Sequence, residues 1–326
     1  MTRRQPAEWM PHEAVWIGFP SHAELWEDDL APARQEVVAF ARAVHADGRG
    51  ERVILVAADA ASADAARTLS GGAADVVIQP FGDIWLRDTG GIITLGPDGR
   101  RAARFGFNWW GGKYHLPGDE GVGGRLAQAA DIPVDSYDWV LEGGAIDVDG
   151  TGLAVTTEQC LLNPNRNPGL LREDVERRLA EGLGIARLLW LGDGLANDHT
   201  DGHVDNLARF VAPGHLALPT PTADDPNAHV YRDATERAYA FGVDVVHLPS
   251  PGLIEVDGEP IPASYMNFYI GNAVVVVPQY GAPNDEAAVS AIGALFPDRV
   301  AIGHRADHIL TGGGSFHCIS QQVPST

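Results

Sequence analysis

Residues 263–304 read ASYMNFYIGNAVVVVPQYGAPNDEAAVSAIGALFPDRVAIGH and contain a polar, aromatic segment followed by strand, helix and strand patterns. The valine run within 273–278 is apolar and β-branched, which is typical of a buried strand. Residues 285–296 begin with two acids, and acids favour a helix start. A second strand pattern follows at 299–304. Because the same order of segments recurs along the chain, it decides the fold prediction.

Five segments are rich in glycine, acids, amides and aromatic residues. They are GDIWLRDTGG (82–91), LEGGAIDVDG (141–150), DHTDGHVDN (198–206), ASYMNFYIGN (263–272) and TGGGSFHC (311–318). One residue from each, namely Asp88, Glu142, His203, Asn267 and Cys318, gives intervals of 54, 61, 64 and 51 residues.

Strand and helix patterns surround these segments in a regular way. Strand patterns follow them at 91–95, 152–157, 206–211, 273–278 and 318–323, and others occur at 76–80, 187–192, 243–249 and 299–304. Helix patterns occupy 32–46, 170–183 and 285–296.

This repetition predicts an α/β fold of recurring helix, strand, polar loop and strand. Radial repetition would bring the five polar segments to one central axis. An ordinary α/β sheet with polar loops is the alternative, and the pattern alone leaves both open. Residues 213–227 are polar and proline-rich, and we interpret them as a loop inside the same domain. No linker is evident, so a single domain over residues 1–326 is expected.

Composition narrows the function class. The 326 residues are 45% hydrophobic, which is enough for a sizeable core. The net charge of −21 argues against nucleic acid or an anionic membrane as partner, and it would attract a small cation. Solubility alone is the competing explanation of that charge. The chain shows no signal peptide and no run of about 18 apolar residues, so a cytoplasmic location is expected.

The two cysteines have different contexts. Two cysteines do not make a disulfide framework. Cys318 follows the glycines 312–314, where the backbone can turn sharply and a ligand can approach closely. A thiol in that position suits a nucleophile. Cys160 follows a strand pattern and precedes two leucines, which favours a buried hydrophobic role.

The segment DHTDGHVDN is the densest polar cluster. On a strand, His203 and Asp205 would point to the same face, where they could transfer protons beside a bound cation. The rival hypothesis is a metal site formed by His199, His203 and Asp205. Gly202 would weaken the helix that such a site needs, and the run after it resembles a strand. A purely structural role for His203 also stays open.

Three acids occupy like-placed segments, namely Asp88, Glu142 and Asp205. Each could simply cap a turn. If the segments converge, however, three carboxylates surround one thiol and one imidazole, and they would repel one another. A guanidinium would resolve that repulsion, because it is planar, always charged and able to bind carboxylates in a bidentate fork. The set therefore predicts a guanidinium substrate.

Other residues near the five segments have simpler interpretations. Aromatic side chains could wall a cation site or belong to the core; they are Trp85, Trp109, Trp110 and Tyr265. Arg87 and Arg166 could balance the acids. The chain has neither a dinucleotide fingerprint nor a phosphate-binding loop motif, so nucleotide binding has no support.

The same stretches resemble the agmatine deiminase family, within the guanidine-modifying or pentein superfamily. The similar stretches are PAEWMPHEAVW, DIWLRDTG, FNWWGGK, LEGGAIDVDG, TTEQCLLNPNRNP, DHTDGHVDN, ASYMNFYIGN and GGGSFHCISQQ. The resemblance implies a five-bladed α/β propeller, with pseudo-fivefold repeats around a central active site. It implies neither a cofactor nor a metal.

The resemblance also implies roles for individual residues. Cys318 would attack the guanidinium carbon, and His203 would move protons. Asp88 and Asp205 would grip the cation, while Glu142 would hold the side of the reacting nitrogen. Trp85 and Asn267 are placed with the substrate-binding residues.

The implied reaction is hydrolytic deimination of agmatine to N-carbamoylputrescine and ammonia through a covalent thiouronium on the cysteine. Deimination of peptidyl arginine is one alternative, and a non-catalytic binding module is another. Gly91 stands where the family has proline, and His199 stands where it usually has an acid. In a pocket of the kind that the family has, His199 would alter the end that binds the second amine of the substrate. Homo-oligomerisation is left open.

Overall fold

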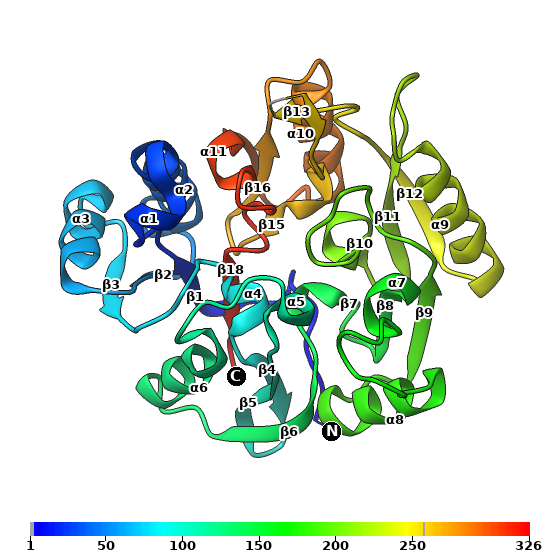
Figure 1. Cartoon of the computed structure of the whole chain (residues 1–326), viewed down its shortest axis with the longest axis horizontal. Helices are drawn as coiled ribbons and strands as arrows, with labels where there is room; N and C mark the ends of the chain where they lie inside the picture. The colour runs from blue at the N-terminus through cyan, green and yellow to red at the C-terminus, as the bar shows by residue number, and fades with distance from the viewer. Residues whose placement is uncertain (1–2, 257) are drawn as a thin grey trace.

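The computed structural model describes residues 3–256 and 258–326, and it has a mixed α/β fold. Among these described residues, five sheets of three or four strands recur along the chain, together with one two-stranded hairpin. The longer helices lie on the outside of the molecule, and the connecting segments run toward its middle (Figure 1). Among the described residues, no helix is long and apolar enough to cross a membrane.

Four sheets share one topology. The first strand pairs antiparallel with the second, and the second pairs parallel with the third across a helical connection. Their strands are β4 (Ile92–Gly96), β5 (Gly99–Gly106) and β6 (Val134–Val140); β7 (Ile146–Val148), β8 (Leu153–Thr157) and β9 (Arg187–Leu191); β10 (Arg209–Ala212), β11 (His215–Thr220) and β12 (Asp244–Pro249); and β15 (Tyr269–Ile270), β16 (Val274–Gln279) and β17 (Val300–Arg305). The connecting helices are α6 (Asp119–Ala129), α8 (Arg172–Leu183), α9 (Ala228–Phe241) and α10 (Asp285–Leu295).

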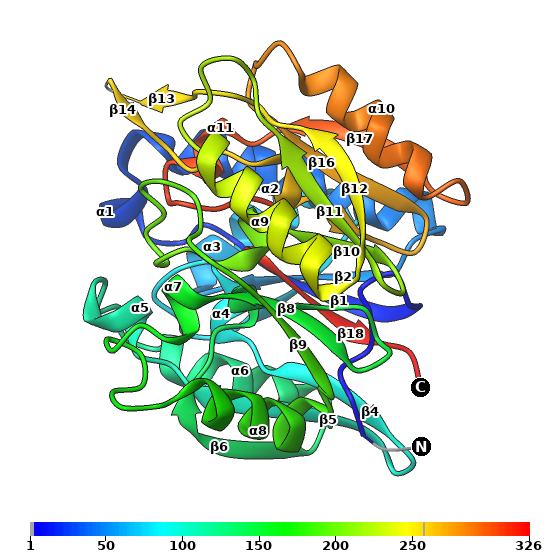
Figure 2. The same ribbon diagram turned by 90° about the vertical axis from the view of Figure 1, so that its right-hand side faces the viewer.

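The remaining sheet joins the two ends of the chain. The C-terminal strand β18 pairs antiparallel with β1, and β1 continues parallel to β2 and β3. Figure 2 shows both termini on the same side of the molecule. The elements are β1 (His12–Gly18), β2 (Arg52–Ala57), β3 (Asp75–Ile78), β18 (Ser320–Pro324), α2 (Leu30–His45) and α3 (Ala60–Ser70).

Short elements complete the chain, and many of them carry the polar segments. They are α1 (Ala23–Trp26), η1 (Glu27–Asp29), η2 (Ala46–Gly48), α4 (Leu86–Thr89), α5 (Trp109–Gly112), η3 (Gly143–Ala145), α7 (Glu158–Leu161), η4 (Val204–Asn206), β13 (Glu255–Val256), β14 (Glu259–Pro260), η5 (Tyr265–Asn267) and α11 (Asp307–Leu310).

The predicted helices at 32–46, 170–183 and 285–296 are confirmed as α2, α8 and α10. The interpretation of 213–227 as a loop is wrong in part, because it contains β11, the middle strand of its sheet. Pro219 lies within that strand, and proline is rare in central strands. The polar segment at 141–150 also contains a strand, β7, which pairs with β8 and in which Asp147 is buried.

Candidate active site

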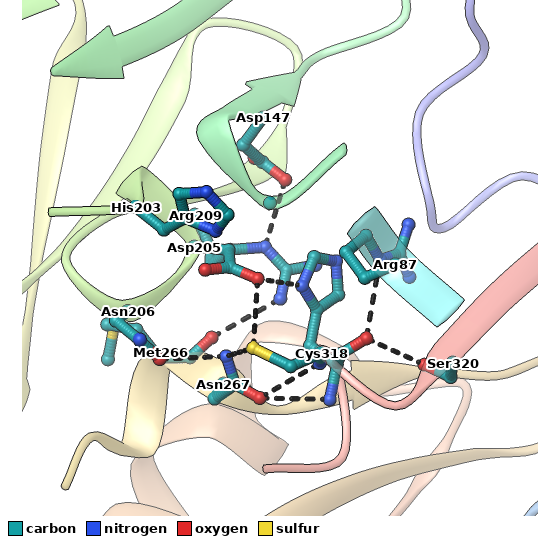
Figure 3. A network of polar contacts seen from close by, with 12 residues as sticks. Arg87, Asp147, His203, Asp205, Asn206, Arg209, Met266, Asn267, Cys318 and Ser320 are labelled. Atoms are coloured by element: carbon teal, nitrogen blue, oxygen red, sulfur yellow. Dashed lines mark hydrogen bonds and ion pairs between the residues drawn. The ribbon is translucent and has the colours of Figure 1, made fainter. Parts of the chain in front are cut away.

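The loop that carries Cys318 is held by one amide side chain. Asn267 Oδ1 accepts hydrogen bonds of 3.1 Å from the backbone N–H groups of Ser315, His317 and Cys318. Asn267 Nδ2 donates to Cys318 Sγ at 3.0 Å and to Asn206 Oδ1 at 2.8 Å (Figure 3). The loop that ends in the thiol is therefore fixed from two sides.

Glycine is required at position 314. A Cβ there would lie 2.8 Å from the Trp85 ring and 3.0 Å from Cys318 Sγ, both too close for a real side chain. Gly313 in the same turn has a φ of +102°, in the left-handed region that favours glycine. The sequence interpretation that these glycines allow close approach to the thiol agrees with this geometry.

Cys318 opens onto a cavity of about 370 Å³. Its side chain is only slightly exposed, and Sγ lies 3.4 Å from Asp205 Oδ2. The described lining residues are Leu25, Trp26, Glu27, Asp28, Asp29, Asp83, Trp85, Asp88, Trp110, Tyr114, Leu116, His199, Thr200, Thr311, Gly312, Gly313, Gly314 and Cys318. Five of them are acids, and none of them is lysine or arginine.

Three of the predicted segments meet at Gly144. Its backbone N–H donates to Asp88 Oδ1 at 3.0 Å. A Cβ at this position would lie 2.6 Å from His203 Nδ1, 2.9 Å from Asp88 Oδ1 and 3.0 Å from Asp205 Oδ2. His203 Nδ1 itself is 3.6 Å from Asp88 Oδ1. The structure thus brings together the acids and the imidazole that the sequence analysis singled out.

Glu142 and Cys160 lie on the other side of His203. Arg166 Nε donates to Glu142 Oε1 at 2.6 Å, while Glu142 Oε2 is buried without a hydrogen-bond partner. The ligand-type atoms of Glu142, Cys160 and His203 all lie within 4.8 Å of one another. Cys160 is fully buried, as expected, but the interpretation of it as an ordinary core residue misses this contact with the site. Both cysteines are free.

That cluster has the donor types of a metal site, but its charges oppose one. The Arg166 guanidinium beside Glu142 would repel a divalent cation. The metal hypothesis based on His199 does not fit either, because the His199 ring stacks on Tyr114 at the cavity wall. His203, in contrast, is completely buried.

Burial and charge perturb the pKa values of the site residues. Burial, followed by the charges of Asp205 and Asp88, raises the pKa of Cys318 well above that of an ordinary thiol. Burial also raises the pKa of Asp88. Burial opposes the charged form of His203, but the charge of Asp88 and the contact with Cys160 outweigh it and raise the histidine's pKa. Both shifts favour the protonated form, a thiol for Cys318 and an imidazolium for His203.

The two arginines near the site are already bound elsewhere. Arg166 pairs with Glu142 and with Asp201 Oδ2, the latter at 2.6 Å. Arg87 donates to Gln322 Oε1 and to the His317 carbonyl oxygen. Neither is among the described residues that line the cavity. Arg166 therefore balances acids as predicted, and Arg87 faces one acid, Glu8, at 3.7 Å. With these contacts, neither arginine is placed to clamp a carboxylate in the cavity.

Comparisons with known proteins connect this site to a family. The family model of Porphyromonas-type peptidyl-arginine deiminase matches residues 4–324. The chain is 36% identical to the agmatine deiminase of Stutzerimonas stutzeri, over 98% of this chain and 95% of that protein. The chain belongs to the Porphyromonas-type peptidyl-arginine deiminase family. The resemblance to agmatine deiminases is thereby confirmed.

Solved structures agree with that assignment. The agmatine deiminase of Enterococcus faecalis superposes with a TM-score of 0.92 and 31% identity, covering 99% of this chain and 96% of that one. A cysteine-to-serine variant of the Campylobacter jejuni agmatine deiminase, solved with substrate bound, gives a TM-score of 0.91 and 27% identity, covering 99% and 97%. The mixed α/β fold of this chain is the fold of these deiminases.

The aromatic residues near the site divide into two groups. Trp85 and Trp110 line the cavity, and Trp110 Nε1 donates to Asp88 Oδ2 at 2.9 Å. Tyr265 instead donates to Asp285 in the core, and Trp109 stacks on His115. Of the four aromatic residues flagged in the sequence, two can therefore contact a bound cation.

Asn267 has contacts that differ from its expected substrate-binding role. Like Glu142, His203 and Asp205, it is buried and not among the described residues that line the cavity. Its amide differs from those groups because it is used to hold the Cys318 loop. The sequence showed an amide in a like-placed segment, but it could not show which direction the side chain takes. The contacts of Asn267 therefore hold the loop and the thiol of Cys318.

Several residues of the site were not found from the sequence. Asp83 accepts hydrogen bonds from the indole N–H groups of Trp26 and Trp85, and burial raises its pKa to about 6. Asp83 lies in the same segment as Asp88, so the segment itself was the available signal. Trp26 and Tyr114 lie outside the five segments and gave no such signal.

Proposed function

We propose that this protein catalyses the hydrolysis of agmatine to N-carbamoylputrescine and ammonia. The observation that carries the proposal is a thiol, Cys318, at the base of a cavity whose described walls hold acids and aromatic rings without a basic side chain other than His199. Carboxylates and aromatic faces are the groups that bind a guanidinium. Agmatine deiminases of similar sequence and structure support the same reaction.

In the first half of the reaction, the guanidinium binds between Asp88 and Asp205. Its positive charge offsets the two carboxylates that raise the pKa of Cys318, so the thiol releases its proton to solvent. The thiolate forms a bond to the central guanidinium carbon. The His203 imidazolium then protonates the departing nitrogen, the C–N bond breaks, and ammonia leaves. A thiouronium remains on Cys318.

In the second half, neutral His203 removes a proton from water, and the resulting hydroxide attacks the thiouronium carbon. The C–S bond breaks, and the hydroxyl proton of the adduct returns to the departing Cys318 sulfur. The product is the substituted urea, and both His203 and Cys318 regain their starting protonation. Glu142 lies beside His203 and is placed to hold the imidazole during both transfers.

The charges of the cavity favour agmatine over free arginine. Agmatine carries a cation at each end, whereas arginine adds a carboxylate beside its amine. A site for that carboxylate needs a cationic clamp, and Arg87 and Arg166 are both bound elsewhere. Burying an unpaired carboxylate among acids would cost several kcal/mol. A single observation favours the second candidate, peptidyl arginine: the matching family model is named for that activity.

We also propose that the five recurring sheets form a five-bladed propeller within a single domain over residues 1–326. Support comes from the shared topology of four sheets and from the pairing of β18 with β1, which brings the last segment beside the first. The proposed active site then lies on the pseudo-fivefold axis. Calculation of the rotation that relates successive sheets checks this: five similar rotations about one axis support it, and unrelated axes contradict it.

The test of the function is ammonia release by the purified protein from agmatine, free arginine, a blocked arginine peptide and short guanidino acids. We expect release from agmatine, with N-carbamoylputrescine identified by mass spectrometry. A rapidly quenched reaction should also show a substrate adduct on the peptide that contains Cys318. Release only from the blocked peptide would replace agmatine by the second candidate, and no release from any compound would contradict deimination.

A further inference from the structure

Two features of the family motifs are not used by the mechanism above. One is Glu8, in the stretch PAEW near the start of the chain, and the other is His317, which directly precedes Cys318. Their side chains are 6% and 2% exposed. Although they lie at opposite ends of the sequence, the structure places them in contact behind the proposed catalytic residues.

His317 joins two carboxylates. Its Nδ1 lies 2.7 Å from Asp205 Oδ2, and its Nε2 lies 2.9 Å from Glu8 Oε2. A neutral imidazole has only one N–H, so its other nitrogen would direct a lone pair at a carboxylate oxygen. When both carboxylates are ionised, both short contacts can be hydrogen bonds only if the ring is an imidazolium.

The surrounding charges are consistent with an imidazolium. Arg209 binds Glu8 Oε2 at 2.7 Å and Asp147 Oδ1 at 2.9 Å, and Arg87 lies 3.7 Å from Glu8. Behind the site, three carboxylates therefore face three cations, counting His317: Glu8, Asp147 and Asp205 against Arg87, Arg209 and His317. Among these six groups alone, a neutral His317 would leave a net charge of −1.

The two carboxylate oxygens of Asp205 have different surroundings. Oδ2 receives His317 and faces the Cys318 thiol, while Oδ1 is buried without a hydrogen-bond partner. The charged groups that face Asp205 are His317, His203, Arg209 and Asp88. Burial opposes its ionisation, but the contacts with His317 outweigh burial and lower its pKa. One oxygen of this fully buried carboxylate is thus without a protein partner, beside the Cys318 side chain that lines the cavity.

We propose that His317, held as an imidazolium between Glu8 and Asp205, is a positioning residue that keeps Asp205 ionised and its free oxygen directed at the substrate guanidinium. Glu8, and with it the N-terminal segment before β1, then belongs to the machinery of the site. The inference rests on the proposed function for the identity of the cation. The protonation of His317 does not depend on that identity.

Two amide substitutions separate the contacts of His317. In His317→Asn the amide nitrogen takes the place of Nδ1, which keeps a donor to Asp205 and loses the charge. In His317→Gln it takes the place of Nε2, which keeps a donor to Glu8 and leaves Asp205 without one. Glu8→Gln removes the charge that holds the far side of the ring. The matched control is Glu13→Gln, which removes an acid of an exposed ion pair in the same N-terminal region.

Agmatine binding is measured by calorimetry at a series of pH values. All variants carry Cys318→Ser, so that agmatine is not consumed during the titration. We expect His317→Gln to raise Kd by roughly tenfold or more, since a hydrogen bond to a charged group is lost. His317→Asn should raise Kd less. The positive charge of His317 lowers the pKa of Asp205, and an opposite charge typically does so by about one unit or more. Without that charge, Asp205 becomes protonated at a higher pH. As the pH is lowered, both His317 variants should therefore lose agmatine binding at a higher pH than the parent does. Glu13→Gln should match the parent.

If His317 has a purely structural role, its variants should have lower thermal stability, but the pH at which they lose agmatine binding should equal that of the parent. The proposal would be overturned if both His317 variants kept the parent's Kd for agmatine and lost binding at the same pH as the parent. Should the variants not fold, nitrogen NMR of the ¹⁵N-histidine-labelled parent protein decides. We expect both ring nitrogens of His317 to carry protons at neutral pH, and a neutral tautomer would overturn the proposal whatever the substrate. Failure of the parent to bind agmatine would count against the proposed function alone.

Discussion

The regions on the two sides of Asp205 are built from similar residues but balance charge differently. Behind Asp205, carboxylates alternate with arginines and with His317, and nearly every charged atom has a partner. In front of it, the described cavity wall has five acids and no lysine or arginine. The rear region pairs its own charges, whereas the front region is complete only when a cation enters. The difference indicates that the missing charge belongs to the substrate.

Cys318 lies at the boundary between these regions and should show the largest effect. Cys318→Ser replaces a thiol by a far weaker nucleophile, so turnover should fall at least about a thousandfold while the cation still binds. Steady-state kinetics and calorimetry check the two halves of this prediction. A variant that keeps turnover within tenfold of the parent would remove Cys318 from the chemistry.

The two carboxylates that are proposed to bind the guanidinium, one in the cavity wall and one at the boundary, should come next. Asp88→Asn and Asp205→Asn keep the shape and remove one charge, and truncating one partner of such a pair commonly costs roughly 2–5 kcal/mol. Both kcat and the affinity for agmatine should therefore fall. Asp75→Asn is the control, because Asp75 belongs to an exposed ion pair with Arg52. Near-normal kinetics in either site variant would place that aspartate outside the substrate contacts.

Much of this comparison could be anticipated from the sequence. The helices α8 and α10 have a clear apolar period, and the segments with Asp88, Glu142, His203 and Cys318 recur at similar intervals. The strand β11 was missed because its proline and its neighbours resemble a loop. Repetition could therefore locate the polar segments but could not describe every strand between them.

The interaction partners of the long charged side chains could not be predicted from the sequence. Arg166 crosses to Glu142 and Asp201, and His317 meets Glu8 from the other end of the chain. Such contacts depend on rotamers and on how separate segments are packed, which sequence spacing does not record. For this reason the sequence indicated which acids converge, while the structure was needed to show which of them are already neutralised.

The resting thiol offers a test of the front region alone. The charge of Asp88 contributes to the raised pKa of Cys318, so Asp88→Asn should lower that pKa and increase the thiolate fraction at neutral pH. Alkylation of Cys318 by iodoacetamide should then be several-fold faster than in the parent at the same pH. The rate is measured by mass spectrometry of the Cys318 peptide. An equal or slower rate would show that the acids in front do not control the thiol.

Cys160 should give the smallest effect. Cys160→Ser should keep turnover within about tenfold, because the nucleophile is untouched. The contact with Cys160 helps to raise the pKa of His203, so Cys160→Ala should lower that pKa. Since ammonia release needs the imidazolium, the alkaline limb of kcat should then move to lower pH. A pH profile identical to that of the parent would mean that Cys160 only fills space beside His203.

The most direct test of the central claim is the ratio of kcat/KM for agmatine to that for free arginine, measured with one preparation. A cavity that lacks a cationic clamp should favour agmatine by at least about a hundredfold, a difference near 2.7 kcal/mol. That result would show that the front region is built for a cation without a carboxylate. Comparable values for the two compounds would contradict the account, because a buried carboxylate would then be accepted among unpaired acids.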